Sequence, residues 1–165
     1  LVRLDPAAAE GMREDWSDLF RAALNDAKTA TLGDELAVAK QYLAIEQRRF
    51  GDRLNVSWDL DPLAADAPVP SLVLQPLVEN AVHHGVESLG ANAWIRVSTR
   101  ASRNGVEIEI ENNVGAPTPT GSGMALANVR ERLRLLHDLD GRFDARRDGD
   151  RFKVRVGVPL KAVAL

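Results

Sequence analysis

Cysteine is absent from this 165-residue sequence, which excludes disulfide bonds and thiolate chemistry and is in keeping with a cytoplasmic location. An excess of positive charge is absent as well, since the formal net charge is −3 and the pI is about 5.6. The sequence therefore lacks the basic footprint of a nucleic-acid-binding protein, and we expect no nucleic acid partner. It also lacks a signal-peptide pattern and any apolar run long enough to span a bilayer.

The composition, 45% hydrophobic and 27% charged, is ordinary for one compact domain with a short extension. The first residue is Leu1 rather than methionine. We therefore expect the sequence to be a piece of a longer protein and any membrane anchor to lie outside it.

An amphipathic helix is predicted near the start of the chain, from Asp5-Pro6 to about Asn25. Aspartate is a favoured helix N-cap, and proline is favoured at the first helical position. The apolar residues that recur at helical spacing are Ala9, Met12, Trp16, Leu19, Phe20 and Ala23. Such a stripe needs a partner, and we expect a helical bundle outside this sequence. Docking onto the following domain is the alternative.

A second helix is predicted to begin at Thr31, the N-cap, and to end at Gly51-Asp52. Its expected buried residues are Leu36, Ala39, Leu43, Ile45 and Phe50. Alternating apolar residues over 54–60 predict a strand.

Two antiparallel hairpins and one more helix complete the predicted elements. The first hairpin covers 94–112, and its Asn-Gly turn is expected to set Arg100 opposite Glu109. Its alternate glutamates, at 107, 109 and 111, are interpreted as a solvated face. A helix over about 124–137 and a hairpin over 142–159 follow. The expected fold is a two-layer α/β sandwich, a mixed sheet with helices on one face.

The segment 71–85 predicts a helix with a concentrated polar side. Its apolar face is formed by Leu74, Leu77, Val78 and Ala81. Glu79, Asn80, His83 and His84 lie within about 1.5 turns of one another, and we expect Gly85 to end the helix. This side is either one wall of a ligand site or an ordinary solvated face.

A second polar segment follows the predicted strand that ends at Asn112-Asn113. Gly115 comes directly after it, and Gly121-Ser122-Gly123-Met124 opens the helix over 124–137. Glycines before a helix N-terminus let the backbone approach a phosphate, and the free N–H groups and the helix dipole favour the anion.

The order of these three segments resembles the GHKL ATP-binding (Bergerat) fold shared by histidine kinases, gyrase, Hsp90 and MutL. The stretch from Gln75 to Gly85, with 42–50 before it and 127–133 after it, is similar to LytS/AlgZ-like sensor histidine kinases. The resemblance implies a catalytic ATP-binding domain over 30–165. Residues 1–29 would then be part of the dimerisation and phosphoacceptor region, its second helix only.

The resemblance also implies the ligands ATP and Mg²⁺ and a role for each site residue. Asn80 would hold the metal ion, Asn112 would bind the adenine, and Gly115 would let the adenine approach. Residues 121–124 would frame the triphosphate beneath a short lid over 116–120.

Three positions qualify this assignment. His83 stands where relatives commonly carry lysine, so its contact with phosphate would depend on pH. His84 matches a position that often packs beside the adenine, and Ala125 replaces a frequent glycine. Glu79 is open to two interpretations: a group that orients or deprotonates a nucleophile, or a capping or solvent-facing acid.

The reaction implied is transfer of the ATP γ-phosphoryl group to a histidine and its relay to a response regulator, expected to be LytTR-type. The acceptor motif Pro-His-Phe-Leu-Phe-Asn is missing, so we expect the acceptor histidine upstream of Leu1. The resemblance further implies a homodimer through the N-terminal helical region and a cytoplasmic domain of an inner-membrane sensor. The alternatives are a catalytically silent nucleotide-binding module and an ATPase that uses Glu79 as base.

Overall fold

The computed structural model of the chain describes residues 29–115 and 142–159. The helices of these ranges are α2 (Leu32–Phe50), α3 (Leu74–Leu89) and the short 3₁₀ turns η1 (Gly51–Arg53) and η2 (Pro62–Ala64). The strands are β1 (Thr29–Thr31), β2 (Leu54–Asp59), β3 (Pro68–Pro70), β4 (Ala93–Ser102), β5 (Gly105–Asn113), β6 (Arg142–Asp148) and β7 (Arg151–Val158). The helices predicted over 6–25 and 124–137 lie outside the described residues.

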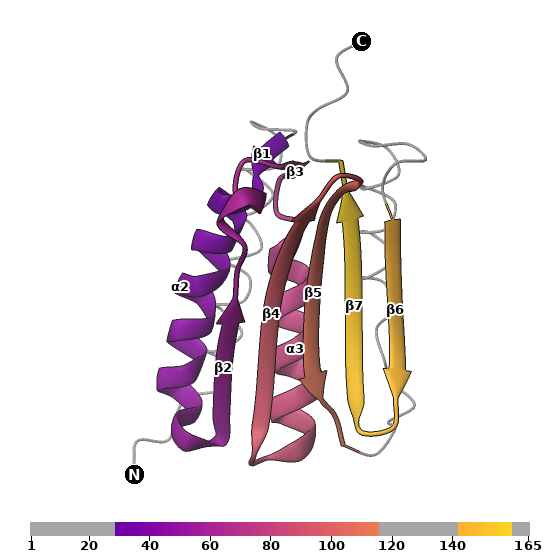
Figure 1. Cartoon of the computed structure of the whole chain (residues 1–165). Coiled ribbons are helices and arrows are strands. Elements are labelled where there is room, and N and C mark those ends of the chain that lie inside the picture. The colour runs from indigo at the N-terminus through magenta and orange to yellow at the C-terminus, as the bar shows by residue number, and fades with distance from the viewer. Residues whose placement is uncertain (1–28, 116–141, 160–165) are drawn as a thin grey trace.

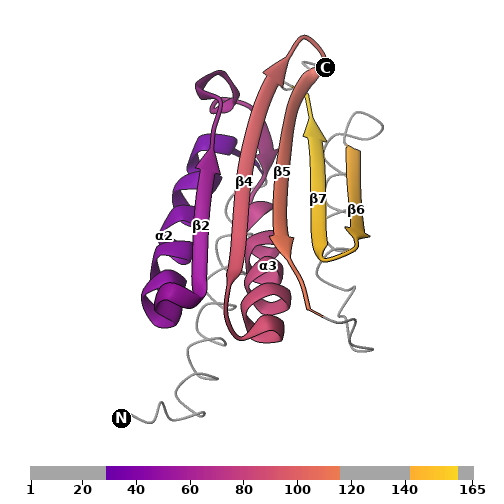
Figure 2. The ribbon, with the colours of Figure 1, turned by 60° about the horizontal axis from the view of Figure 1, so that its bottom comes forward.

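Five strands form the main sheet in the order β2-β4-β5-β7-β6. The β2–β4 pair is parallel and the other pairs are antiparallel, so the sheet is mixed. Helices α2 and α3 cover the same face of this sheet, whereas no described helix covers the other face (Figures 1 and 2). The predicted two-layer sandwich is confirmed. Strands β1 and β3 form a separate antiparallel pair.

Helix α2 begins and ends where the sequence predicts. The Thr31 hydroxyl accepts a hydrogen bond from the Asp34 N–H at 3.2 Å, and Gly51 is the C-cap. Leu36, Ala39 and Leu43 are buried as expected, but Ile45 is 49% exposed, so its assignment to the core was wrong. Ile45 lies about 200° around the helix from Leu43, because each residue advances about 100°.

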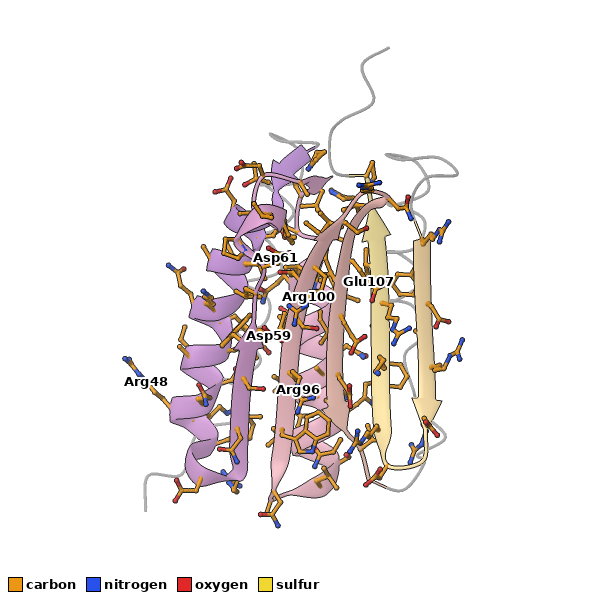
Figure 3. All side chains as sticks on the ribbon, in the orientation of Figure 1. Arg48, Asp59, Asp61, Arg96, Arg100 and Glu107 are labelled. Atoms are coloured by element: carbon orange, nitrogen blue, oxygen red, sulfur yellow. The ribbon has the colours of Figure 1, made fainter. Side chains whose placement is uncertain are left out.

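The register of the first hairpin differs from the prediction. Ser102 pairs with Gly105, so Arg100 lies opposite Glu107 and not opposite Glu109. Gly105 belongs to the strand and not to the turn, and a Cβ there would come within 2.4 Å of the Val158 carbonyl oxygen. The Arg100 side chain pairs instead with Asp59 of β2 (Figure 3).

The glutamates of β5 are less solvated than expected. Glu107 is exposed, but Glu111 is only 4% exposed. The Glu111 carboxylate lies 3.4 Å from Arg151 Nη1 and 3.5 Å from Lys153 Nζ, both on β7. The solvated-face interpretation was therefore wrong for Glu111, because neighbouring long side chains cover and pair it.

Helix α3 extends past Gly85 to Leu89 and ends at Gly90, whose φ is +73°. The expectation that Gly85 ends the helix was wrong. Gly85 is buried inside the helix, and a Cβ there would lie 3.4 Å from the Asn113 carbonyl oxygen. This glycine therefore brings the helix close to the end of β5, which is where the predicted site residues lie.

The start of α3 is tied to α2 by a buried carboxylate. Glu35, 6% exposed, accepts a hydrogen bond from the Leu72 N–H at 2.7 Å. Leu72 has a φ of 61°, an uncommon conformation for a residue with a side chain. The contact fixes the turn from which α3 starts. In the described part of the chain, no helix is both long and apolar enough to cross a membrane.

Candidate functional site

Asn80 lies on the polar side of α3 and is half-buried. In the described ranges, no residue forms a hydrogen bond with its side chain. Its neighbour Glu79 is exposed, and the Glu79 carboxylate accepts a hydrogen bond from Gln75 Nε2 at 3.0 Å. Among the described residues, the Asn80 amide is therefore not engaged by another side chain.

His83 and His84 have different surroundings although they are adjacent. His83 is exposed, and its Nδ1 pairs with the Glu87 carboxylate one turn further along α3. The two imidazole rings meet edge to face with centroids 5.1 Å apart. Partial burial lowers the pKa of His84, and the nearby His83 lowers it further. Burial therefore favours the neutral form of His84, whereas the exposed His83 is engaged by Glu87.

Asn112 and Asn113 close β5 and point to opposite faces of the sheet. Asn112 is 1% exposed, and its Nδ2 donates to the Asn113 carbonyl oxygen at 3.0 Å. It lies on the helix-covered face against Gly85, whose Cβ, if present, would be 3.6 Å from Nδ2. The residue predicted to bind adenine therefore lies between α3 and the end of the sheet.

Asn113 has a structural task that the sequence reasoning missed. Its Oδ1 accepts from the Trp94 N–H at 2.8 Å, and its Nδ2 donates to the Asn92 carbonyl oxygen at 2.8 Å. These bonds hold the connection from α3 to β4 beside β5. Strand alternation is the sequence signal that could have distinguished the roles of the two asparagines, because successive residues of a strand point to opposite faces of the sheet.

Gly115 contacts the last turns of α3. Its N–H donates to Ser88 Oγ at 3.3 Å, and its carbonyl oxygen accepts from Arg147 Nη2 at 2.6 Å. A Cβ at Gly115 would lie 3.4 Å from the Ser88 carbonyl oxygen. Ser88 and Arg147 therefore help to fix the chain after β5, and no local sequence pattern marks either residue.

The structure brings together two of the three predicted segments. The C-terminal half of α3 lies beside the end of β5, where Gly85 packs against Asn112 and Ser88 accepts a hydrogen bond from the Gly115 N–H. Asn80 and His84 stand on the same helix. The third segment, Gly121, Ser122, Gly123 and Met124, lies outside the described residues, as does the lid over 116–120. The described donors suit the expected ligands: an amide oxygen is a ligand that Mg²⁺ accepts, and an amide can both donate to and accept from a base.

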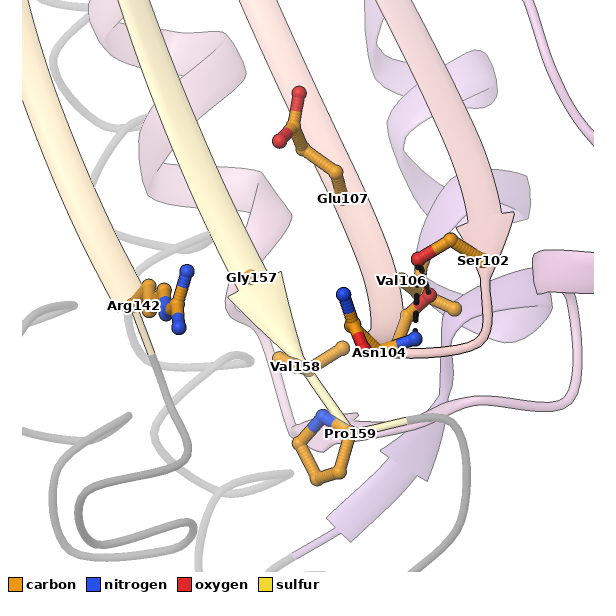
Figure 4. Close-up of a pocket in the computed structure, with 9 residues that line it drawn as sticks. Ser102, Asn104, Val106, Glu107, Arg142, Gly157, Val158 and Pro159 are labelled. Carbon is orange, nitrogen blue, oxygen red and sulfur yellow. Dashed lines mark hydrogen bonds between the residues drawn. The ribbon is translucent and has the colours of Figure 1, made fainter.

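An open depression lies at the opposite end of the sheet, beside the turn between β4 and β5 (Figure 4). It is lined by Ser102, Asn104, Gly105, Val106, Glu107, Arg142, Gly157, Val158 and Pro159. None of these is a predicted site residue, so the depression is separate from the region around Asn112.

The histidine kinase family model matches residues 1–54. The sensor histidine kinase YpdA of Escherichia coli K12 is 32% identical over 149 residues, which cover 82% of this chain and 26% of YpdA. The sensor protein LytS of Staphylococcus saprophyticus is 31% identical over an alignment of 175 positions, gaps included, which covers 96% of this chain and 30% of LytS. The chain belongs to the histidine kinase family.

Solved structures agree with this assignment at the level of the fold. The nucleotide-free catalytic domain of histidine kinase ThkA matches with a TM-score of 0.62 at 13% identity, covering 81% of this chain and 98% of that domain. The predicted resemblance to LytS-like sensor histidine kinases and the predicted fold are both confirmed. The chain spans only 26% to 53% of the length of YpdA, LytS and YwpD of Bacillus subtilis.

Proposed function

We propose that this chain is the ATP-binding catalytic part of a sensor histidine kinase, which transfers the γ-phosphoryl group of ATP to a histidine outside this sequence. One observation carries the proposal. Gly85 of α3, the helix that carries Asn80, packs against Asn112 at the end of β5, in a chain related to sensor histidine kinases.

Each described site residue has a task in this proposal. The Asn80 amide oxygen would hold Mg²⁺, which would supply neutralisation of the phosphate charge. The Asn112 amide hydrogen-bonds to the edge of the adenine, and Gly115 leaves space beside it. Transfer then depends on positioning and on charge stabilisation more than on covalent chemistry by the protein.

The acceptor histidine is proposed to lie outside this sequence. The chain holds three histidines. His83 and His84 belong to the site region itself, and His137 lies outside the described residues. None stands in a Pro-His-Phe-Leu-Phe-Asn context.

The partners are proposed from the relatives. Histidine kinase ThkA has been solved in complex with the response regulator TrrA, and its structure matches this chain with a TM-score of 0.63 at 15% identity. By analogy, the phosphoryl group passes to an aspartate of a response regulator, for which we propose the LytTR type. We also propose a homodimer through the N-terminal region and a cytoplasmic position within a membrane-anchored sensor.

Labelled ATP tests this proposal in the full-length protein. We expect transfer of the γ-phosphoryl group to the protein as an acid-labile, Mg²⁺-dependent adduct. The adduct disappears in Asn80→Ala and persists in the control Asn104→Ala, an exposed residue of the β4–β5 turn. ATP binding without the adduct would identify a silent nucleotide-binding module. Release of free phosphate that Glu79→Gln abolishes would identify an ATPase.

A further inference from the structure

The sheet face that no described helix covers carries side chains of opposite charge on neighbouring strands. Glu109 and Glu111 of β5 form salt bridges with the cations of β7, which are Arg151, Lys153 and Arg155. Residues directly opposite one another in a pair of strands share a face, so their side chains meet. Over most of the length of β5, acidic and basic side chains therefore satisfy one another.

One row of this face leaves its charges unpaired. Gly157 of β7 lies directly opposite Glu107 of β5 on one side and Arg142 of β6 on the other. Gly157 has no side chain to meet Glu107, and Arg100, opposite Glu107 on β4, is engaged by Asp59. Within the described ranges, neither Glu107 nor Arg142 forms a salt bridge or a side-chain hydrogen bond. An unpaired carboxylate and an unpaired guanidinium therefore flank this glycine.

The same row lines the open depression at this end of the sheet (Figure 4). The depression has a volume of about 460 Å³, which is within the range of pockets that hold small molecules. A Cβ at Gly157 would lie 3.3 Å from the Cβ of Arg142, so the glycine keeps space between the two charged side chains. The exposed Asn104 adds an amide, which can donate and accept, at the turn between β4 and β5.

The two opposite charges define the class of ligand that fits. A simple anion would pair with Arg142 but would be repelled by Glu107, and a simple cation would meet the reverse problem. A molecule that carries both an ammonium group and a carboxylate satisfies both residues.

The spacing of the two charged residues suits a small molecule of this kind. Glu107 and Arg142 lie two strand spacings apart, which is about 9–10 Å between their backbones. Two charge-assisted hydrogen bonds of about 2.7–2.9 Å, together with the short span between the charged groups of an amino acid, cover this separation.

We propose that the depression is a binding site for a small zwitterion of the amino-acid type. Arg142 binds the carboxylate of the ligand, Glu107 binds its ammonium group, and Asn104 contacts it from the turn. The site is separate from the region around Asn112, so the inference does not depend on the proposed function.

Titration of the 165-residue chain with each of the common L-α-amino acids, followed by amide NMR shifts, tests the inference. We expect at least one amino acid to bind and to shift the amides of the residues that line the depression. Acetate and methylamine, which carry one charge each, should bind at least about tenfold more weakly, because each lacks one charge-assisted hydrogen bond.

Substitutions in the row test the role of each charge. Glu107→Gln and Arg142→Gln should each reduce the affinity by about tenfold or more. Gly157→Ala should also weaken binding, because the new methyl group displaces the Arg142 side chain. Arg103→Gln and Asp52→Asn, at exposed positions outside the depression, are the matched controls and should leave the affinity unchanged.

The contrary outcomes are specific. Absence of binding by every amino acid overturns the inference, and so does binding that Glu107→Gln and Arg142→Gln leave unchanged. Equal affinity for acetate also overturns it and identifies a simple anion site. Both charged residues are exposed, so their replacement leaves the core intact, and the NMR spectrum of each variant reports whether it has folded.

Discussion

At the scale of single residues, Asn112 and Asn113 show how strand alternation divides two identical side chains between two tasks. Asn112 faces α3 on the covered side of the sheet, whereas Asn113 holds the connection from α3 to β4 through hydrogen bonds to residues 92 and 94. Replacement of Asn112 should therefore affect the ligand, and replacement of Asn113 should affect the fold.

We expect Asn112→Ala to weaken ATP binding by about 2- to 12-fold, the equivalent of one neutral hydrogen bond of about 0.5–1.5 kcal/mol. Binding of GTP should change less, because its base presents a different edge. Competition titrations with both nucleotides measure the difference, with the exposed Asn55→Ala as control. An equal loss for GTP would remove adenine recognition from Asn112.

His84 makes the stability of the fold depend on pH. Its pKa in the folded chain is lowered below the ordinary value of 6.5 by burial and by His83. The unfolded chain therefore binds the proton more readily, and acidification through the range below about pH 6.5 costs stability. Above that range the effect is absent, since His84 is neutral in both states.

Urea unfolding at about pH 7.5 and at about pH 5.5 measures this effect. The free energy of unfolding should fall more on acidification in the unaltered chain than in His84→Gln, which cannot take up the proton. Equal losses in the two proteins would show that His84 does not contribute to the acid sensitivity.

At the scale of elements, the glycine inside α3 is informative because packing in the described structure does not require it. A Cβ at Gly85 would meet Asn113 O at 3.4 Å and Asn112 Nδ2 at 3.6 Å, which are ordinary contacts. Glycine inside a helix costs about 0.5–1 kcal/mol relative to alanine. We therefore predict that the space beside Gly85 serves the proposed nucleotide.

We expect Gly85→Ala to keep or raise the melting temperature and to weaken ATP binding, because the new methyl group occupies space beside Asn112. Differential scanning fluorimetry and calorimetric titration give the two values. Gly90→Ala is the matched comparison: it should lower stability, since Gly90 has a φ of +73°. A Gly85→Ala protein with unchanged ATP affinity would show that the ligand does not use this space.

The contact between α2 and the start of α3 yields a second prediction for the elements. Glu35→Ala leaves the buried Leu72 N–H without its acceptor and should cost about 1–3 kcal/mol of unfolding free energy. Glu35→Gln keeps an acceptor oxygen of similar reach and should cost less. Urea unfolding of both variants checks the order, and equal losses would mean that the hydrogen bond does not stabilise this contact.

At the scale of the whole molecule, the sequence predicted the layers better than the details. Hydrophobic periodicity was sufficient to predict that α2, α3 and both hairpins exist, because each element buries one face. It failed at Gly85, because α3 continues through this glycine and ends at Gly90 instead. It failed at Gly105 for a related reason, since β7 and not the turn determines that position.

The site was predictable to the extent that its residues stand on regular elements. Helical spacing placed Glu79 and Asn80 on one side of α3, and Asn112 was predicted at the end of a strand, where the structure has it. The partners of these residues come from distant parts of the chain, as Arg147 does for Gly115, and no local pattern identifies them. The sequence does not distinguish Gln75 from its neighbours, because its burial and its unpartnered oxygen are visible only in the structure.

The central claim is that the Asn80 amide holds the magnesium ion of a bound ATP. Calorimetric titration of the chain with ATP in Mg²⁺ tests it most directly, with Asn80→Ala measured beside the unaltered protein and both checked by urea unfolding. The account predicts saturable binding that disappears in Asn80→Ala while the free energy of unfolding is unchanged. Equal affinity in the two proteins would contradict it.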